Sequence, residues 1–458
     1  MTITTRNGAS AGANDALAAN GTDADNGAAE STAVTADQKI DRQVIGLVGG
    51  AHFLSHYLIF LLPPILPLLK ADFAVSYAAL GLIITIFNLS SGLTHVPMGF
   101  LVDRIGARRL LTYGVAASTI IYFSMGAIGT YSAILVLAAM AGVANSVYHP
   151  ADYALLSASI SPKRIGRAFS LHTFAGFAGG AVAPLVMAYT SMQWGWRVGL
   201  MLTGVVGLAV LLSLLLGRRY LSDSTTQPTK AVEAAEAKNT ADKLPESNKS
   251  GQSNAASEKS GMALLFSMPI FMCFLFFIML SMSQGGISTF AVAAFVSIQD
   301  ISLKGAQMAL TAFLVGSAVG VLIGGQIADR TRHHEWVAVI GFLITAVVIF
   351  GVGNMMLSAG WVIAAMALAG LNFGVIMPSR DMLVRAVTPE GSMGKVFGFV
   401  STGLNIGGAI TPVFFGWLMD QGEPRLLFWF APLFMLMATV TVLAARWARP
   451  NVEAPLKV

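Results

Sequence analysis

The sequence GFLVDR at residues 99–104 comes back as GQIADR at residues 325–330. Each copy closes a long apolar run with a glycine, three further residues and an Asp-Arg pair. Six more residues recur between the same two regions at one common offset: Pro150, Gly166, Phe169, Gly179, Gly180 and Pro184 reappear as Pro378, Gly394, Phe397, Gly407, Gly408 and Pro412. Self-similarity at a fixed spacing indicates duplicated structural units. The chain is therefore predicted to consist of two related halves.

The composition places both halves in a membrane. Of the 458 residues, 55% are hydrophobic and only 11% are charged, which is typical of polytopic membrane helices and not of a soluble domain. A helix needs about 20 apolar residues to cross the hydrocarbon core. Runs of that length are predicted at 43–67, 77–101, 109–129, 132–157, 166–190 and 197–217, and again at 263–295, 306–328, 335–357, 361–386, 395–419 and 426–446. The prediction is an all-α membrane protein with twelve transmembrane helices.

Polar segments separate and flank these runs. Residues 1–41 are poor in large apolar side chains and are predicted to form a disordered cytoplasmic tail. Residues 218–260 are predicted to be a cytoplasmic linker between the units 42–217 and 261–447, and residues 448–458 a second cytoplasmic tail. Arg and Lys gather in the loops on one side of the predicted membrane, so the positive-inside rule places both termini in the cytoplasm. We expect a multi-pass protein of a bacterial-type inner membrane.

The sequence lacks the motifs that several classes of function require. The single cysteine, Cys273, excludes a disulfide framework and a cysteine metal cluster. The net charge of +5 is explained by loop topology, so no nucleic-acid partner is expected. No Walker-type loop and no HExxH helix is present, so neither an enzyme nor ATP-driven transport is predicted. We expect a monomer without a cofactor that uses protons as the coupling ion.

The loop motifs carry a family resemblance. GFLVDRIGARR, residues 99–109, resembles the signature loop of the major facilitator superfamily, and GQIADRTRHH, residues 325–334, resembles its weaker copy. The resemblance covers residues 43–446 and implies two pseudo-symmetric six-helix bundles around a cavity that opens alternately to each side. Within the superfamily, HVPMGFLVDR at 95–104 and SVYHPADYALLS at 146–157 are similar to the fosmidomycin-resistance branch. The sequence departs from that branch at His56 and at Arg380 and Asp381.

The same loops predict a gate. An Asp near a helix C-terminus and basic residues in a Gly-containing turn can form charge-assisted bonds to neighbouring helix ends. The candidate gating residues are Asp103, Arg104, Arg108, Asp329 and Arg330. The alternative is that these charges only set the topology.

Ionisable side chains inside the apolar runs mark the candidate binding site, because such groups are costly in a membrane and usually functional. His52 and His56 lie four apart on one predicted helical face, and His149 and Asp152 lie three apart, with Pro150 predicted to kink their helix. His172 lies in the next predicted span. We interpret these residues as proton or substrate ligands. Metal binding by His52 and His56 would need further ligands that the sequence does not place, and a purely structural polar pair is the other alternative.

The second half adds opposite charges. Arg380 occupies the position equivalent to Asp152, and Asp381 follows it. One hypothesis is an ion pair between Asp152 and Arg380 that closes the cytoplasmic gate, and the rival is that Arg380 is the counter-charge for an anionic substrate. Further cavity-wall candidates are Gln284, Asn372 and Asn405.

These observations predict a proton-coupled secondary transporter of a small organic, anionic solute that works by alternating access. The alternative is a drug or metabolite:proton antiporter that acts in efflux. A copper importer is a further reading, based on Met268 and Met272, although a His–Met pair expected in the next helix is missing. A membrane sensor that does not transport is the remaining class.

Overall fold

The computed structural model describes residues 40–160, 164–221, 264–299, 301–389 and 393–447. Residues 1–39 and 448–458 of the predicted tails and nearly all of the predicted linker lie outside the described residues, so these three predictions stay predictions. Residues 40 and 41, which were assigned to the first tail, already belong to the first helix. Within the described residues every regular element is a helix and no strand occurs, which agrees with the predicted all-α class.

The first half begins with a helix over residues 40–59, which ends shortly before two consecutive prolines, Pro63 and Pro64. The elements that follow are η1 (Pro63–Ile65), α2 (Leu66–Phe73), α3 (Tyr77–Ile105), α4 (Ala107–Ile128), α5 (Tyr131–Asn145), α6 (Tyr148–Ser159), α7 (Ile165–Leu216) and η2 (Arg218–Tyr220). The second half contains α10 (Met268–Ile298), α11 (Leu303–Arg330), α12 (His334–Asn354), α13 (Ala359–Val387), α14 (Met393–Asp420), η3 (Pro424–Leu426) and α15 (Leu427–Trp447).

Helix α7 crosses the membrane twice. Its 52 residues would measure about 78 Å if straight, far more than the hydrocarbon core of about 30 Å. Gly195 breaks it with φ 84° and ψ 157°, a conformation that suits glycine. Eleven segments of the described chain are long and apolar enough to span a membrane, and one of them, Ala168–Leu216, contains this break. The described residues therefore make twelve crossings, as predicted.

The fourth predicted span is also interrupted. Helix α5 ends at Asn145 and α6 begins at Tyr148, so the axis breaks one turn before Pro150. A proline has no N–H for the carbonyl four residues earlier, which is that of Ser146, and its ring crowds that carbonyl. The predicted kink at Pro150 is confirmed. The kink changes the direction of the short helix that carries His149 and Asp152.

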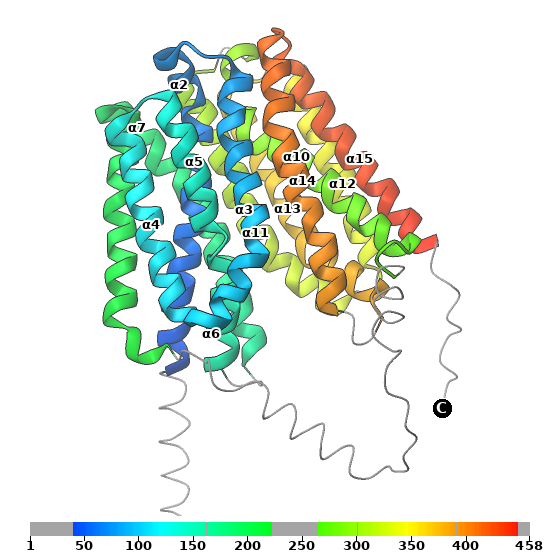
Figure 1. Ribbon diagram of the computed structural model, residues 1–458. Helices are drawn as coiled ribbons and strands as arrows, with labels where there is room; N and C mark the ends of the chain where they lie inside the picture. The colour runs from blue at the N-terminus through cyan, green and yellow to red at the C-terminus, as the bar shows by residue number, and fades with distance from the viewer. Residues whose placement is uncertain (1–39, 161–163, 222–263, 300, 390–392, 448–458) are drawn as a thin grey trace, which may run out of the picture.

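The two bundles meet along α3 with α14 and along α7 with α11, and Figure 1 shows α3 and α14 side by side. Their separation grows along the shared face. A Cβ at Gly81 would collide with the carbonyl oxygen of Pro412, and one at Gly92 would lie 3.4 Å from the Cβ of Asn405. At Gly99 it would meet no atom within 4 Å. The bundles are therefore in contact at the end of the molecule that holds α2 and separate toward the opposite end.

Candidate functional site

A cavity of about 940 Å³ lies between the two bundles and is lined by residues of both. Its walls include ionisable and amide side chains that the sequence had singled out: His56, His149, Gln284, Asp329, Arg380, Asp381 and Asn405. Asn88, Ser91, His95 and Asn145 add further polar groups. A mostly apolar cavity with a few convergent polar groups is the usual form of a small-molecule site.

A buried carboxylate lies behind this wall. Asp152 of α6 is 0% exposed, and its Oδ2 lies 3.0 Å from the Nε2 of His172, which belongs to α7. The Nδ1 of His52, in the first helix, lies 3.3 Å from the same oxygen but is not aligned for a hydrogen bond. An ionised carboxylate only accepts hydrogen bonds, so the Nε2 of His172 carries the proton when Asp152 is charged.

The imidazole rings pack around this carboxylate from three helices. The ring of His52 stacks on that of His172 with 3.7 Å between centroids, and lies 4.7 Å from His56 and 5.1 Å from His149. We call His52, His56, His149, Asp152 and His172 the histidine–aspartate cluster. His56 and His149 face the cavity, whereas the other three members lie behind them. The structure therefore brings together the five residues that the sequence had proposed from separate helices.

The cluster has fewer hydrogen bonds than its polar atoms can make. Within the described part of the chain, Asp152 Oδ1, His149 Nδ1 and His172 Nδ1 are buried without a hydrogen-bond partner. A buried charge that lacks partners costs several kcal/mol, and unsatisfied buried groups in a native fold call for an explanation such as a functional role. Binding a proton at Asp152 would neutralise this charge.

Three members of the cluster lie especially close together. The ligand-type atoms of His52, Asp152 and His172 lie within 4.8 Å of one another. The two ring nitrogens lie 3.0 and 3.3 Å from the same carboxylate oxygen, a spacing that hydrogen-bonded groups and metal ligands share. Proton sharing and metal binding therefore stay the two alternatives that the sequence left open.

Gly176 of α7 allows the first helix to approach the cluster. A Cβ at this position would lie 2.6 Å from the Nε2 of His52 and 3.1 Å from the Cδ2 of His56. Sequence reasoning missed this residue, because it stands in a run, AGFAGGAVAP, in which every glycine is explained equally well by close helix packing.

Arg380 and Asp381 pair with each other. The Nη2 of Arg380 lies 2.8 Å from Oδ1 of Asp381, Nε donates to the same oxygen at 2.9 Å, and the guanidinium lies over the ring of Phe277 at 5.0 Å. The hypothesised ion pair between Asp152 and Arg380 is not formed in this structure. The pair is absent because Asp152 lies behind the histidines and is bonded to His172 instead of facing the cavity.

Asn372 was predicted to line the cavity and is not among the lining residues. Its amide donates to the carbonyl oxygen of Leu368 in the same helix at 2.9 Å. An amide side chain in a long apolar helix can either face the cavity or hydrogen-bond to the backbone of its own helix, and the sequence spacing does not decide between these two positions.

The predicted cytoplasmic latch is only partly visible. The side chain of Asp103 lies outside the described residues, Arg104 and Arg330 are exposed, and Asp329 lines the cavity. Arg108 donates to the carbonyl of Arg218 at 3.3 Å. Among the described residues no ion pair involving Asp329 or Arg330 crosses between the bundles, so the latch stays a prediction.

A polar closure at the opposite end was missed. Asp420, the last residue of α14, accepts hydrogen bonds from the backbone N–H groups of Tyr77 at 2.7 Å and Ala78 at 2.8 Å. Lys70 lies 3.6 Å from the same carboxylate and 3.9 Å from the ring centroid of Tyr77. Gln307 of α11 donates to the carbonyl of Pro64 at 2.9 Å. A carboxylate at a helix N-terminus satisfies free N–H groups and the helix dipole together, so Asp420 ties one bundle to the other.

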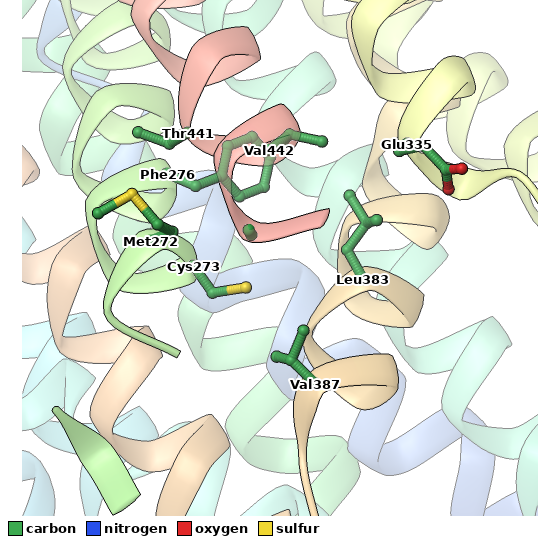
Figure 2. Close-up of a pocket in the computed structure, with 9 residues that line it drawn as sticks. Met272, Cys273, Phe276, Glu335, Leu383, Val387, Thr441 and Val442 are labelled. Carbon is green, nitrogen blue, oxygen red and sulfur yellow. The ribbon is translucent and has the colours of Figure 1, made fainter. Parts of the chain in front are cut away.

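The two methionines suggested by the sequence lie in different surroundings. Met268 is 56% exposed, whereas Met272 borders a small pocket of about 10 Å³. Figure 2 shows Met272 and Cys273 on one helix, with Leu383 between Cys273 and Glu335 in this view. Cys273 and Glu335 belong to no group of three candidate metal ligands within the described ranges.

Comparison with known proteins identifies the family. The model of the Major Facilitator Superfamily matches residues 48–302 and 274–457. The chain belongs to the Major Facilitator Superfamily. This confirms the resemblance found in the sequence, and because members of this family are transporters and not enzymes, the predicted absence of enzymatic activity is confirmed as well.

Several relatives match most of this chain. The fosmidomycin resistance protein of Escherichia coli (strain K12) is 23% identical over 68% of this chain and 72% of its own length. The uncharacterized transporter YfnC of Bacillus subtilis (strain 168) is 26% identical over 82% and 86%. The membrane sensor protein UhpC of Escherichia coli (strain K12) is 24% identical over 77% and 79%.

A solved structure shows the same fold. A bacterial homolog of the human lysosomal transporter Spinster, in an inward-facing and unoccupied conformation, superposes with a TM-score of 0.66 at 14% identity. The match covers 89% of this chain and 95% of the other. The two pseudo-symmetric six-helix bundles predicted from the sequence are therefore the fold of this superfamily member.

Proposed function

We propose that this superfamily member is a proton-coupled secondary transporter of a small organic solute with an anionic group. The observation that carries the proposal is the buried Asp152, bonded to His172 and in contact with His52, directly behind a cavity that His56 and His149 line. A dry carboxylate among imidazoles has two states, charged and protonated, whose balance depends on access to the aqueous cavity. Such a group is suited to carry the coupling proton.

The anionic group of the solute is assigned to Arg380. Among the described residues that line the cavity, Arg380 is the one Lys or Arg side chain, and its planar guanidinium suits carboxylate and phosphate groups. Asp381, half exposed, holds that guanidinium in this structure. A solute anion would replace Asp381 at Arg380, so Asp381 acts as a built-in competitor.

The arrangement of the bundles supports the proposal of alternating access. In this structure Asp420 and Gln307 tie the bundles together at the α2 end, and toward the opposite end an added Cβ at Gly99 would meet no atom within 4 Å. With the predicted orientation, in an inner membrane with both termini cytoplasmic, this conformation faces the cytoplasm. The predicted latch at Asp103, Arg104, Arg108, Asp329 and Arg330 would close the other end in the opposite conformation. A single chain encloses the whole cavity, which favours a monomer.

Efflux is the second candidate. The fosmidomycin resistance protein is one of the relatives, and a multidrug resistance protein, MdtG of Proteus mirabilis (strain HI4320), is 27% identical over 31% of the chain. These names favour a solute:proton antiporter that exports a drug or metabolite. The same cluster would serve efflux. A proton that binds together with the solute gives symport, and a proton that competes with the solute gives antiport.

A sensor without transport is the third candidate, favoured by the similarity to UhpC. The test uses the full chain in proteoliposomes that contain a trapped pH-sensitive dye, with a panel of organic acids, phosphorylated solutes and drugs. A transporter gives proton movement that depends on one solute, and the sign of that movement separates symport from antiport. Solute binding, seen as a thermal shift at two pH values, without any proton or solute flux would support the sensor and contradict the proposal.

A further inference from the structure

The two ring nitrogens of His52 face different surroundings. Nδ1 lies 3.3 Å from Oδ2 of Asp152, deep behind the cavity wall. Nε2 lies against Gly176, where an added Cβ would come within 2.6 Å of it. Gly176 itself lines the cavity, and His52 keeps 4% of its surface exposed. The ring therefore spans the wall between the cavity and the buried carboxylate.

From this geometry we infer that His52 relays protons between the cavity and Asp152, and that Gly176 is the positioning residue that keeps the cavity side of the ring uncovered. This inference rests on the proposed proton-coupled function. An imidazole that accepts at one nitrogen and donates at the other is a proton shuttle. His172 cannot take this role from the cavity side, because its Nε2 is bonded to Asp152 and its Nδ1 is buried without a partner among the described residues.

Each cycle of the relay carries one proton to Asp152. His52 starts with its proton on Nδ1 and a bare Nε2. A hydronium ion in the cavity gives a proton to Nε2 and becomes water, the Nδ1–H bond breaks, and that second proton passes to Oδ2 of ionised Asp152. The products are a neutral carboxyl group and a neutral His52 that carries its proton on Nε2. Since the 3.3 Å contact lacks hydrogen-bond alignment in this structure, a rotation of the ring accompanies each transfer, and release follows the same steps in reverse.

The groups that face this relay come from four elements. They are His56 in the first helix, His95 in α3, His149 and Tyr153 in α6, and His172 in α7. The rings of His56 and His149 lie 4.7 and 5.1 Å from that of His52 and line the cavity, so they can pass protons toward Nε2. In the described structure neither His56 nor His149 lies within ion-pair distance of Asp152, whereas His52 does, which leaves His52 as the link.

The test uses protons as the probe and needs no solute. The full chain in lipid receives a pulse of photo-released protons, and time-resolved infrared spectroscopy follows the C=O band of protonated Asp152, which Asp152→Asn identifies by its loss. We expect Gly176→Ala and His52→Ala to slow the rise of this band by about a hundredfold, the lower end of what a positioned proton-transfer group contributes. Gly50→Ala is the matched control, because a Cβ there meets no atom within 4 Å, and it should keep the wild-type rate.

Free imidazole gives a second measurement that does not depend on how Gly176→Ala folds. It should restore fast protonation of Asp152 in His52→Ala, because the deleted ring is reached from the cavity. Wild-type rates in both His52→Ala and Gly176→Ala, or a failure of imidazole to rescue folded His52→Ala, would overturn the relay. A wild-type protein in which the Asp152 band never appears would instead overturn the proposed proton site.

Discussion

His172 and Asp152 join α7 to α6 by a hydrogen bond of 3.0 Å between two side chains that are 2% and 0% exposed. This bond satisfies one oxygen of a carboxylate that has no contact with water, and it holds the short helix after the Pro150 kink against α7. The pair thus stabilises the fold and positions the group to which we assign the coupling proton.

Loss of the His172 donor is expected to destabilise the protein. His172→Phe keeps a ring of similar size but leaves Asp152 without its hydrogen bond, and a bond to a charged group contributes roughly 1.5–3 kcal/mol. Thermal unfolding of the purified protein above neutral pH should show this loss. His172→Gln, which retains a donor, should recover part of it, and His95→Gln, whose histidine is outside the cluster, should lie within about 0.5 kcal/mol of wild type. Equal stability of His172→Phe and wild type would contradict the assigned bond.

Replacement of the cavity cation should weaken solute binding. Arg380→Gln removes the charge and the fork of donors, so we expect affinity for an anionic solute to fall by about tenfold to a hundredfold, as for a lost charge-assisted bond. Arg380→Lys should recover little, because an ammonium lacks the planar fork. Asp381→Asn removes the competing carboxylate and should raise affinity. Isothermal titration of each variant with the solute found in the screen measures both changes, and weaker binding by Asp381→Asn would contradict the competitor role.

The cap by Asp420 is expected to hold the α2 end closed. Asp420→Asn loses the charge and one of two acceptors at the start of α3, a change of roughly 1–2 kcal/mol for a helix cap. That corresponds to about a tenfold shift toward conformations open at this end. Spin labels introduced by Thr130→Cys and Met356→Cys, in a Cys273→Ala background, report the separation of the bundles there. Glu423→Gln is the nearby control, and an unchanged distance distribution in Asp420→Asn would contradict the closing role of Asp420.

The sequence predicts the fold well because its signals are local. Apolar runs, loop charges and the repeated GxxxDR motif each lie within one segment, and the spacing of His149 and Asp152 places both on one helical face. The stacking of His52 on His172 is different, because it depends on how the first helix and α7 pack, and no local pattern encodes that contact.

Two features depend on packing that no local pattern encodes. The duplication aligns Asp152 with Arg380, but pseudo-symmetry does not fix the direction in which a side chain points, and in this conformation, open at the end opposite α2, the hypothesised pair is not formed. Asp420 was overlooked because charged residues at helix ends are common and rarely stand out in a sequence. Its partners are the backbone N–H groups of Tyr77 and Ala78, which no side-chain motif reveals.

The measurement that tests the central claim most directly is solute-coupled proton flux in proteoliposomes that contain Asp152→Asn. The amide copies the shape of the carboxylate but cannot bind the coupling proton. We predict that Asp152→Asn loses the dependence of solute movement on an imposed pH gradient while it still exchanges labelled for unlabelled solute at equal pH. Asp381→Asn, which changes a carboxylate in the cavity wall, should remain coupled. Proton-coupled transport by Asp152→Asn at the wild-type rate would contradict the account.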